Sequence, residues 1–508
     1  MKLACKTILQ WPKLAWVASI ESGCQEMQVL CGPMVEKAED WVVEAVWAGD
    51  FEKGGFDQTD LVFGTGVRCR DNGVAFISSG STLDRLVYRV HAQGCQVSNS
   101  LGALLACAKC ELRDDYDYSK DLKSICRGLA CYARSIPASD GNIGLAYYNN
   151  LIWDGRSLRE VAKPDACLAL SDFSDYRQFL TRTAQRIADN IRARERKHAM
   201  QPLVSISSGY DSVAAAVIVS QAGCRHAVTI GQSTSLWRGS DSGALPAHIL
   251  GLQCRTYPRT SRFFPHEEAI WAVGGRPGVL NWTLFDYPEP LCCFFTGCHG
   301  DKVWTRDAAE LSDPFVIPSI AELGIGEFRL IKGIVHCPVP HWGIRHLKEI
   351  RAITFREEMK PWTLGKKGYD RPIARRIVEE AGVPRGAFAI RKKNTAHEAA
   401  FLWPYSPEAR LRFAAFLKKR GLYAPARRML SLVRRLDHVE NLLHLNLLGK
   451  IGMRKRLRPW DHMQGTSLIF YWANEQLKQR YLDGLREIAS PAAAPTSASS
   501  EATEATRP

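Results

Sequence analysis

The chain has 508 residues, of which 46% are hydrophobic and 24% charged, and its formal net charge is +14. These values are those of an ordinary globular protein with one to three domains, and the positive charge permits an anionic partner, including a nucleotide. No apolar run reaches the roughly 18 residues that a membrane helix needs, and no signal peptide is recognisable, so we expect a cytoplasmic protein without a membrane partner. The 16 cysteines follow no spaced framework, which favours free thiols.

The first part of the chain, residues 1–165, contains many short segments that favour strands. The segments at 73–79, 85–94 and 143–153 are rich in β-branched and aromatic residues. Residues 98–110 predict a helix with a Ser/Asn cap. This mixture predicts an α+β domain over residues 1–165.

The second part predicts a parallel sheet. Residues 171–200 predict one long amphipathic helix, and strands then alternate with helices, which is typical of α/β folds. After about residue 405 the chain predicts helices, and its final residues are of low complexity. We therefore expect an α/β domain over 170–485 and a disordered tail over 486–508.

The junction "SSGYDS", Ser207 to Ser212, lies between a predicted buried strand at 202–207 and an alanine-rich predicted helix that ends at Gly223. Loops at the carboxyl ends of parallel strands bind ligands, and the amino end of the following helix favours an anion. Small residues let the backbone approach phosphates, and Asp211 fits this anion site as a Mg²⁺ ligand. The alternative interpretation is an ordinary capped strand–helix turn.

This junction resembles the S-G-G-x-D-S signature of the ATP pyrophosphatase (PP-loop) superfamily. Tyr210 falls at the free position, and Ser208 replaces the first glycine; if that position needs a positive φ, the replacement costs roughly 1–2 kcal/mol. The resemblance implies that the loop binds ATP and that Asp211 binds Mg²⁺. The implied ATP-binding residues of this loop are Ser207, Ser208, Gly209, Asp211 and Ser212.

A second junction, "TGCHGD" at 296–301, follows another predicted buried strand. It resembles the asparagine synthetase motif S-G-E-G-A-D-E-L-F, in which the aspartate is the second Mg²⁺ ligand. The resemblance implies that Thr296 and Gly297 contact the nucleotide and that Asp301 binds the metal. Gly300 stands at the alanine of the motif, whereas Cys298, His299 and Lys302 depart from it.

A third segment, residues 368–396, resembles the synthetase stretch in which a helix, a Pro and an R-x-K sequence follow one another. Lys393 aligns with the catalytic lysine of the family, which neutralises charge on the phosphates and on the reacting centre, and Lys392 is a close competitor. The alternative is a basic loop at a helix end.

Residues 170–405 together resemble the PP-loop synthetase domain of the asparagine synthetase superfamily, which includes β-lactam synthetases and lasso-peptide cyclases. The resemblance implies a ligase that uses ATP and Mg²⁺ to adenylate a small-molecule or peptide carboxylate and then joins it to an amine; a partner protein could supply the substrate. Residues 1–165 faintly resemble the glutaminase domain of the family, an Ntn-hydrolase-like α+β fold. Its nucleophile is a cysteine at position 2, where this chain has Lys2, and Cys5 is internal, so we expect a degenerate scaffold without glutaminase activity.

Two other functions stay open. The motif departures also fit a catalytically degenerate, non-enzymatic homologue. Basic stretches at 417–435 and 452–460 fit a tRNA-modifying PP-loop enzyme, but their spacing also fits solvated faces of amphipathic helices, so nucleic acid is not the favoured partner. We do not favour metal sites at Cys107 and Cys110, or at the cluster of Cys292, Cys293, Cys298 and His299, nor Cys298 as a covalent nucleophile.

Overall fold

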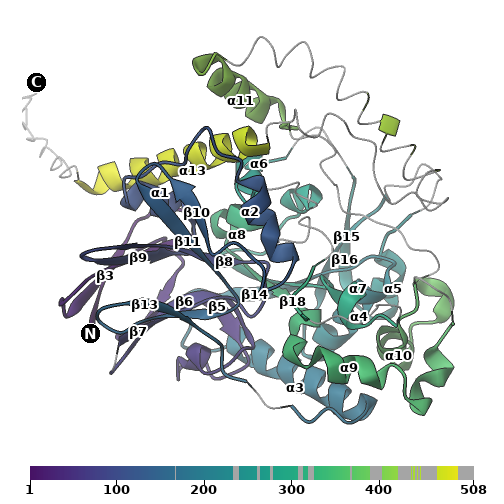
Figure 1. The fold of residues 1–508 in the computed structure, drawn as a ribbon. Coiled ribbons are helices and arrows are strands. Elements are labelled where there is room, and N and C mark those ends of the chain that lie inside the picture. Colours follow the sequence, from purple (N-terminus) through teal and green to yellow (C-terminus); the bar gives the residue numbers. More distant parts are fainter. Residues whose placement is uncertain are drawn as a thin grey trace, which may run out of the picture.

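The protein is a mixed α/β fold with one parallel sheet and two largely antiparallel sheets (Figure 1). The computed structural model describes residues 1–71, 73–165, 168–232, 240–259, 264–274, 279–306, 313–317, 325–365, 369–389, 403–421, 436, 439, 440, 443, 447 and 466–489. Every helix among these residues is too short or too polar to span a bilayer.

The N-terminal part forms two sheets in the described residues. The seven-stranded sheet has the order β1 (Lys2–Thr7), β3 (Glu26–Cys31), β2 (Trp16–Glu21), β9 (Gly94–Ser98), β8 (Arg85–His91), β11 (Gly141–Tyr147) and β10 (Ser135–Ala138). The six-stranded sheet has the order β13 (Leu158–Val161), β12 (Asn150–Trp153), β7 (Gly73–Ile77), β6 (Val62–Arg70), β5 (Trp41–Trp47) and β4 (Glu36–Lys37). Neighbouring strands are antiparallel except β1 and β3, which are parallel.

These two sheets pack face to face. Alternate residues of β2, such as Trp16 and Ala18, share one buried cluster with Val42 and Phe76 of the six-stranded sheet. The predicted strand at 143–153 is in fact two strands, because β11 and β12 lie in different sheets. The chain turns between them at Tyr148, whose φ is +60°. Tyr148 is itself a residue type with high β-propensity, so it does not mark the break between β11 and β12 in the sequence.

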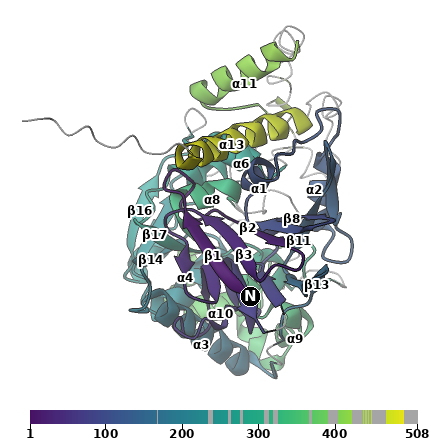
Figure 2. The ribbon, with the colours of Figure 1, turned by 90° about the vertical axis from the view of Figure 1, so that its left-hand side faces the viewer.

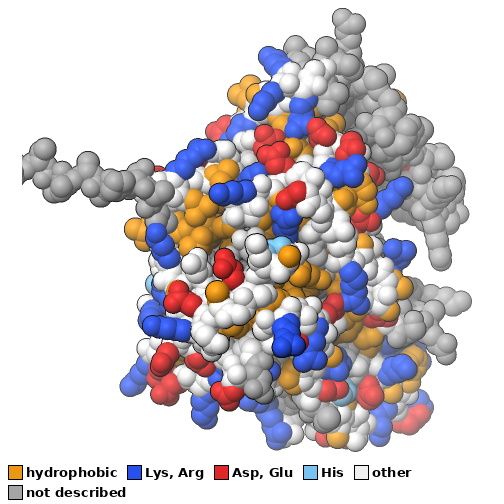
Figure 3. Space-filling model, turned by 60° about the vertical axis from the view of Figure 1, so that its left-hand side comes forward, with side chains coloured by type: hydrophobic (Ala, Val, Ile, Leu, Met, Phe, Trp, Pro, Cys, Tyr) orange, Lys and Arg blue, Asp and Glu red, His pale blue; other side chains and the backbone are white. Residues whose placement is uncertain are grey.

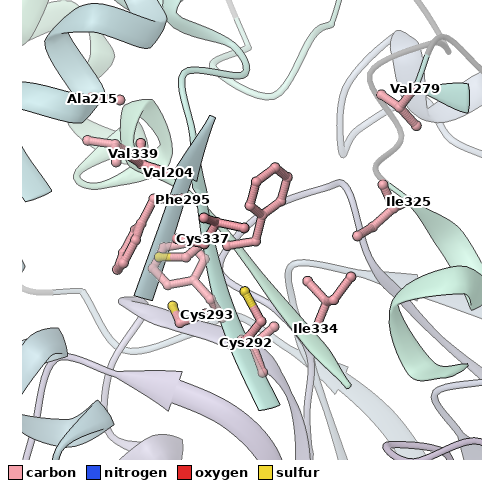
Figure 4. Packing of buried hydrophobic residues seen from close by; sticks show 14 of the residues in the cluster. Val204, Ala215, Val279, Cys292, Cys293, Phe295, Ile325, Ile334, Cys337 and Val339 are labelled. Carbon is pink, nitrogen blue, oxygen red and sulfur yellow. The ribbon is translucent and has the colours of Figure 1, made fainter. Parts of the chain in front are cut away.

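The parallel sheet of the described residues has the order β16 (Gln253–Tyr257), β15 (His226–Ile230), β14 (Met200–Ser205), β17 (Leu291–Thr296) and β18 (Ile334–Pro338). In chain order this is 3-2-1-4-5, so the direction of winding reverses between β14 and β17. All residues of β17 are buried, and Figure 4 shows Cys292, Cys293 and Phe295 packed among apolar side chains of the neighbouring strands. Such apolar strands are typical of a parallel sheet that is covered on both faces.

The helices in the described chain are α1 (Leu101–Cys107), α2 (Ser119–Lys123), α3 (Phe173–Ile191), α4 (Tyr210–Gln221), α5 (Ala244–Ile249), α6 (Glu267–Trp271), α7 (Gly300–Val303), α8 (Gly326–Lys332), α9 (Leu347–Ile353), α10 (Pro372–Glu380), α11 (Pro407–Lys419) and α13 (Thr466–Ala489). Helices α3, α4 and α10 cover one face of the parallel sheet, and α6 and α8 lie toward the other (Figure 1). Helix α4 ends before Gly223, whose φ is +98°, as the sequence predicts. Helix α3 is shorter than the predicted 171–200, and Arg196 beyond it hydrogen-bonds the backbone oxygen of Asn190 at 2.8 Å.

The C-terminal helix α13 connects the two parts of the molecule. It packs against α1 of the N-terminal part and against α6 (Figure 2). The indole nitrogen of Trp11 donates to the backbone oxygen of Tyr481 at 3.1 Å, and Asn474 donates to the oxygen of Ala272 at 3.5 Å. A second connection is a buried ion-pair cluster, in which Arg329 of α8 donates to Glu44 of β5 at 2.8 and 3.1 Å and to Asp84 at 2.7 Å.

Candidate functional site

The predicted phosphate loop lies where β14 ends and α4 begins. Gly209 is the N-cap residue of α4, with φ −80° and ψ 163°, and glycine has no side chain that could cap the helix. The backbone N–H of Ser207 donates to Ser212 Oγ at 3.0 Å, the two Oγ atoms are 2.8 Å apart, and the Gly209 N–H donates to Ser207 Oγ at 3.2 Å. The hydroxyls thus fold the loop into a compact turn over the first turn of the helix.

Ser208 does not carry the strain that its position could have imposed. It is not among the described residues with a positive φ, so replacing glycine costs no left-handed conformation. Its N–H donates to the backbone oxygen of Asp241 at 3.0 Å, and its hydroxyl donates to Asp241 Oδ1 at 2.5 Å. The serine therefore ties the loop to the segment before α5, a contact that glycine could not make through a side chain.

Tyr210, the one large ring in the loop, is fully buried and anchors the helix rather than facing a ligand. Arg375 of α10 donates to its hydroxyl, and the ring lies 4.8 Å from that of Tyr369 and 5.8 Å from that of Phe388, centroid to centroid. The first turn of α4 is thereby fixed against α10. The sequence gives no sign of this role, because Arg375 is 165 positions away.

The second predicted loop packs directly on the first. Strand β17 is the parallel neighbour of β14, so both loops leave the same edge of the sheet. A Cβ atom at Gly300 would lie 2.6 Å from Asp211 Cβ and Cγ, and one at Gly297 would lie 2.5–2.6 Å from the backbone of Asp211 and Ser212. Both positions therefore require glycine, because the helix terminus approaches the loop too closely for any side chain.

Thr296, which is predicted to contact the nucleotide, is buried at the end of β17. It is 1% exposed, and its Oγ1 is 2.9 Å from Nε2 of His336 on β18. Burial lowers the pKa of His336 to about 4, so the imidazole is neutral at pH 7. The Thr296 hydroxyl is engaged inside the sheet, and Gly297 is the member of the predicted pair that reaches the loop.

The motif departures that follow have local structural roles. His299 adopts φ +74°, a left-handed conformation that favours glycine, and its ring lies 4.9 Å from that of His341. Lys302 is 6% exposed and donates to the backbone oxygens of Asp313 and Val316 at 2.8 and 2.5 Å. These contacts connect the second loop to the residues that pack around it.

One of the two predicted metal ligands, Asp211, is paired with Arg371. The guanidinium of Arg371 forms an ion pair with Asp211, and the two side chains are 7% and 19% exposed, respectively. Burial lowers the pKa of Arg371, but the carboxylates of Asp211 and, at longer range, Asp301 outweigh it, so the pKa is raised overall. Asp301 is thus close enough to act electrostatically on the guanidinium that Asp211 binds, and no sequence motif indicates Arg371.

The predicted catalytic lysine, Lys393, and its competitor Lys392 lie outside the described residues. The described stretch 369–389 stops four residues before Lys393. The Ala389 N–H donates to the backbone oxygen of Ser208 at 2.6 Å. The end of this stretch thus contacts the loop at 207–212 directly.

The cysteines form no metal centre in the described chain. Cys292 and Cys293 lie within β17 rather than on the loop, and burial raises the pKa of both thiols well above its usual value. No group of three or more His, Cys, Asp or Glu residues with metal-binding geometry occurs among the described residues. Cys107 is the last residue of α1, and Cys110 lies beyond the end of the helix.

The basic C-terminal stretches lie mostly outside the described residues. In the described part, α11 buries Phe413 and Phe416 and exposes Lys418 and Lys419, as an amphipathic helix does. Figure 3 shows basic and acidic side chains interspersed over the visible face. On that face, the described charges do not form the basic stripe that is typical of a nucleic-acid interface.

No family model matches the chain, and no curated protein is significantly similar to it. At the end of the parallel sheet, two glycine-containing loops, the amino end of α4 and the ion pair of Asp211 with Arg371 lie together, and Asp301 is close enough to act on the same guanidinium. Such a site can bind a polyphosphate together with a divalent cation.

Proposed function

We propose that the protein is an ATP-dependent ligase that adenylates a carboxylate and transfers the acyl group to an amine. One observation carries the proposal: two small-residue loops, each with an aspartate, meet at the ends of β14 and β17, where the strand order reverses. In open parallel sheets, ligands bind in the crevice at this switch point. The motif resemblance to asparagine synthetases adds the reaction type, and the need for ATP fits a cytoplasmic enzyme.

The residue types and the close packing of the two loops are compatible with bound Mg²⁺ and ATP. Mg²⁺ is usually held by one or two carboxylates, and substrate phosphates and water complete its coordination; Asp211 and Asp301 would supply the carboxylates. The absence of Cβ atoms at Gly297 and Gly300 keeps the loops close, and the amides at the amino end of α4 favour phosphate oxygens. When bound, Mg²⁺ would offset negative charge on the phosphates. The phosphate-binding residues would be Ser207, Gly209, Ser212 and Gly297, because both donors of Ser208 bind Asp241.

The proposed reaction has two steps. A carboxylate oxygen bonds to the α-phosphorus of ATP while the bond to the β-phosphate breaks, so pyrophosphate leaves. The amine nitrogen then bonds to the acyl carbon, loses a proton, and AMP leaves. Negative charge develops first on pyrophosphate and then on an oxyanion, and the ammonium of Lys393 would stabilise both. The substrates would be a small-molecule or peptide carboxylate and an amine, and a partner protein could deliver the carboxylate.

The amine would not come from glutamine hydrolysed by this chain. The glutaminases that the N-terminal part faintly resembles attack with a cysteine thiolate. Cys5 lies inside strand β1, and burial, followed by the nearby Cys31, raises the pKa of its thiol. A thiol with a raised pKa is a poor nucleophile at neutral pH. This supports a scaffold role for the N-terminal sheets.

Calorimetric titration of ATP in the presence of Mg²⁺ tests the proposal. Asp211→Asn keeps the shape of the side chain but removes its charge, so the Mg²⁺-dependent part of ATP affinity should fall at least about tenfold, or 1.4 kcal/mol. Asp189→Asn, on the exposed side of α3, is the matched control and should bind as the wild type does. Equal affinity in Asp211→Asn and the wild type would remove this loop from the nucleotide site.

Assays of product release and of tRNA binding separate the ligase from its alternatives. A ligase should also release AMP and pyrophosphate in equal amounts when its carboxylate is added. A degenerate homologue would release neither AMP nor pyrophosphate, whether or not it still binds Mg²⁺ and ATP. A tRNA-modifying enzyme would bind tRNA with an affinity that falls steeply with salt.

A further inference from the structure

Arg371 occupies the centre of the candidate site in a way that the motif resemblance does not explain. It is the N-cap residue of α10 and donates from Nη1 to Asp211 Oδ2. No hydrogen bond to the described residues uses its other two nitrogens. A guanidinium has five N–H donors, so most of its donors remain for another partner.

The neighbouring arginines are engaged elsewhere. Arg375 binds the Tyr210 hydroxyl and pairs with Glu379 at 3.4 Å. Arg376 pairs with Glu358 at 2.9 Å and with Glu380 at 2.7 Å. Of these three arginines on or next to α10, Arg371 is therefore the one held by the metal-site aspartate.

The charges at Asp211 put Arg371 and a metal ion in competition. The carboxylates of Asp211 and Asp301 repel a polyphosphate, and Mg²⁺ bound to them would offset that repulsion. The metal would need a direct bond of about 2.0–2.1 Å to a carboxylate oxygen. Two cations at one carboxylate repel each other, so the metal and Arg371 compete for Asp211.

We propose that Arg371 is a polyphosphate-binding residue that serves as the counter-ion of Asp211 until the metal arrives, and then turns to the phosphates. This inference rests on the proposed function and adds that binding of the metal and binding of the polyphosphate favour each other. The planar guanidinium can bind phosphate oxygens in a bidentate manner. Its carbon lies 5.3 Å from the centroid of the Tyr369 ring, and Arg375 fixes α10 to Tyr210, so the side chain can turn while the helix stays in place.

The test measures two affinities that should change in opposite directions. Mn²⁺ alone, followed by electron paramagnetic resonance of the free ion, reports the competition at Asp211. Inorganic pyrophosphate titrated calorimetrically with excess Mg²⁺ reports phosphate binding. In Arg371→Gln, we expect Mn²⁺ to bind about tenfold more tightly and pyrophosphate about tenfold more weakly. Arg371→Lys should restore part of the pyrophosphate affinity, because it restores the charge without the fork.

Arg376→Gln, on the same helix, is the matched control and should change neither affinity. A thermal melt of each variant checks that the protein is folded. If the wild type binds pyrophosphate and Arg371→Gln binds it with the same affinity, this inference is wrong, but the proposed function is unaffected. Mn²⁺ affinity that stays equal or falls in Arg371→Gln would likewise overturn it, since the arginine would then be a purely structural partner. A wild type that binds neither ATP nor pyrophosphate would overturn both.

Discussion

The contact between the two loops at Gly300 can be tested by adding a single methyl group. In Gly300→Ala, the new Cβ would lie 2.6 Å from Asp211 Cβ and Cγ and 2.8 Å from Oδ1, whereas ordinary contacts begin at 3.4 Å. The Asp211 side chain must therefore move by about 0.8 Å. Overpacking of this kind costs about 1–3 kcal/mol, and the stiffer unfolded chain returns about 0.4–1 kcal/mol. We expect a net loss of about 1–2 kcal/mol in stability. We also expect a loss of about 10²-fold in turnover, because a shift of 1 Å at a reacting centre can cost that much.

Gly386→Ala provides the matched control, since a Cβ atom there would meet nothing within 4 Å. Urea denaturation should leave Gly386→Ala at wild-type stability or slightly above it. Titration of ATP with Mg²⁺ should show weakened binding in Gly300→Ala alone. If Gly300→Ala kept both the stability and the ATP affinity of Gly386→Ala, the two loops would not be packed as described and the site built on them would be wrong.

Three further predictions address the rest of the chain. Arg329→Ala leaves two buried carboxylates without their cation and should lower the free energy of unfolding by about 3–5 kcal/mol in urea titrations, whereas Lys53→Ala breaks a solvent-exposed pair and should leave the urea midpoint unchanged. Burial lowers the pKa of Lys163 from 10.5 to about 7, so between these values the unfolded chain binds more protons than the folded chain. Stability should gain up to about 1.4 kcal/mol per pH unit from this group as pH rises through that window, and denaturation series at several pH values should lack this gain in Lys163→Met. Lys393→Ala should bind ATP nearly normally but lose about 10²–10³ in single-turnover rate, while Lys392→Ala should lose much less; equal, small losses would contradict a catalytic role.

Local patterns were sufficient to predict the parallel sheet. The runs that form β14 and β15 are short, apolar and β-branched, and an alanine-rich helix closed by Gly223 lies between them. The strand and helix patterns were sufficient here because the residues that end each element lie within the same short segment. The segment at 143–153 misled for the opposite reason, since strand propensity does not say which sheet a strand joins.

The site was predictable only as far as its motifs reach. The small residues of both loops meet because their strands are neighbours, which follows from the order of a parallel sheet. The ion pair of Arg371 with Asp211 spans 160 positions, and the contact of Arg375 with Tyr210 spans 165. Partners so distant are chosen by the packing of α10 on α4, and no local pattern encodes that packing. His299 also could not be foreseen, because its left-handed backbone is maintained by the fold around it.

Helix α13 is synthesised last but covers a surface of the N-terminal part, which is synthesised first. The apolar face of α1 is closed by side chains of α13, and Trp11 finds its hydrogen-bond acceptor 470 positions later. At 5–20 residues per second, a ribosome needs on the order of 20–90 s to cover that distance. During that time the nascent N-terminal sheets expose the surface that α13 will cover. A message cut before residue 466 would therefore yield a protein that ends with this surface open, prone to aggregation and a natural target for chaperones.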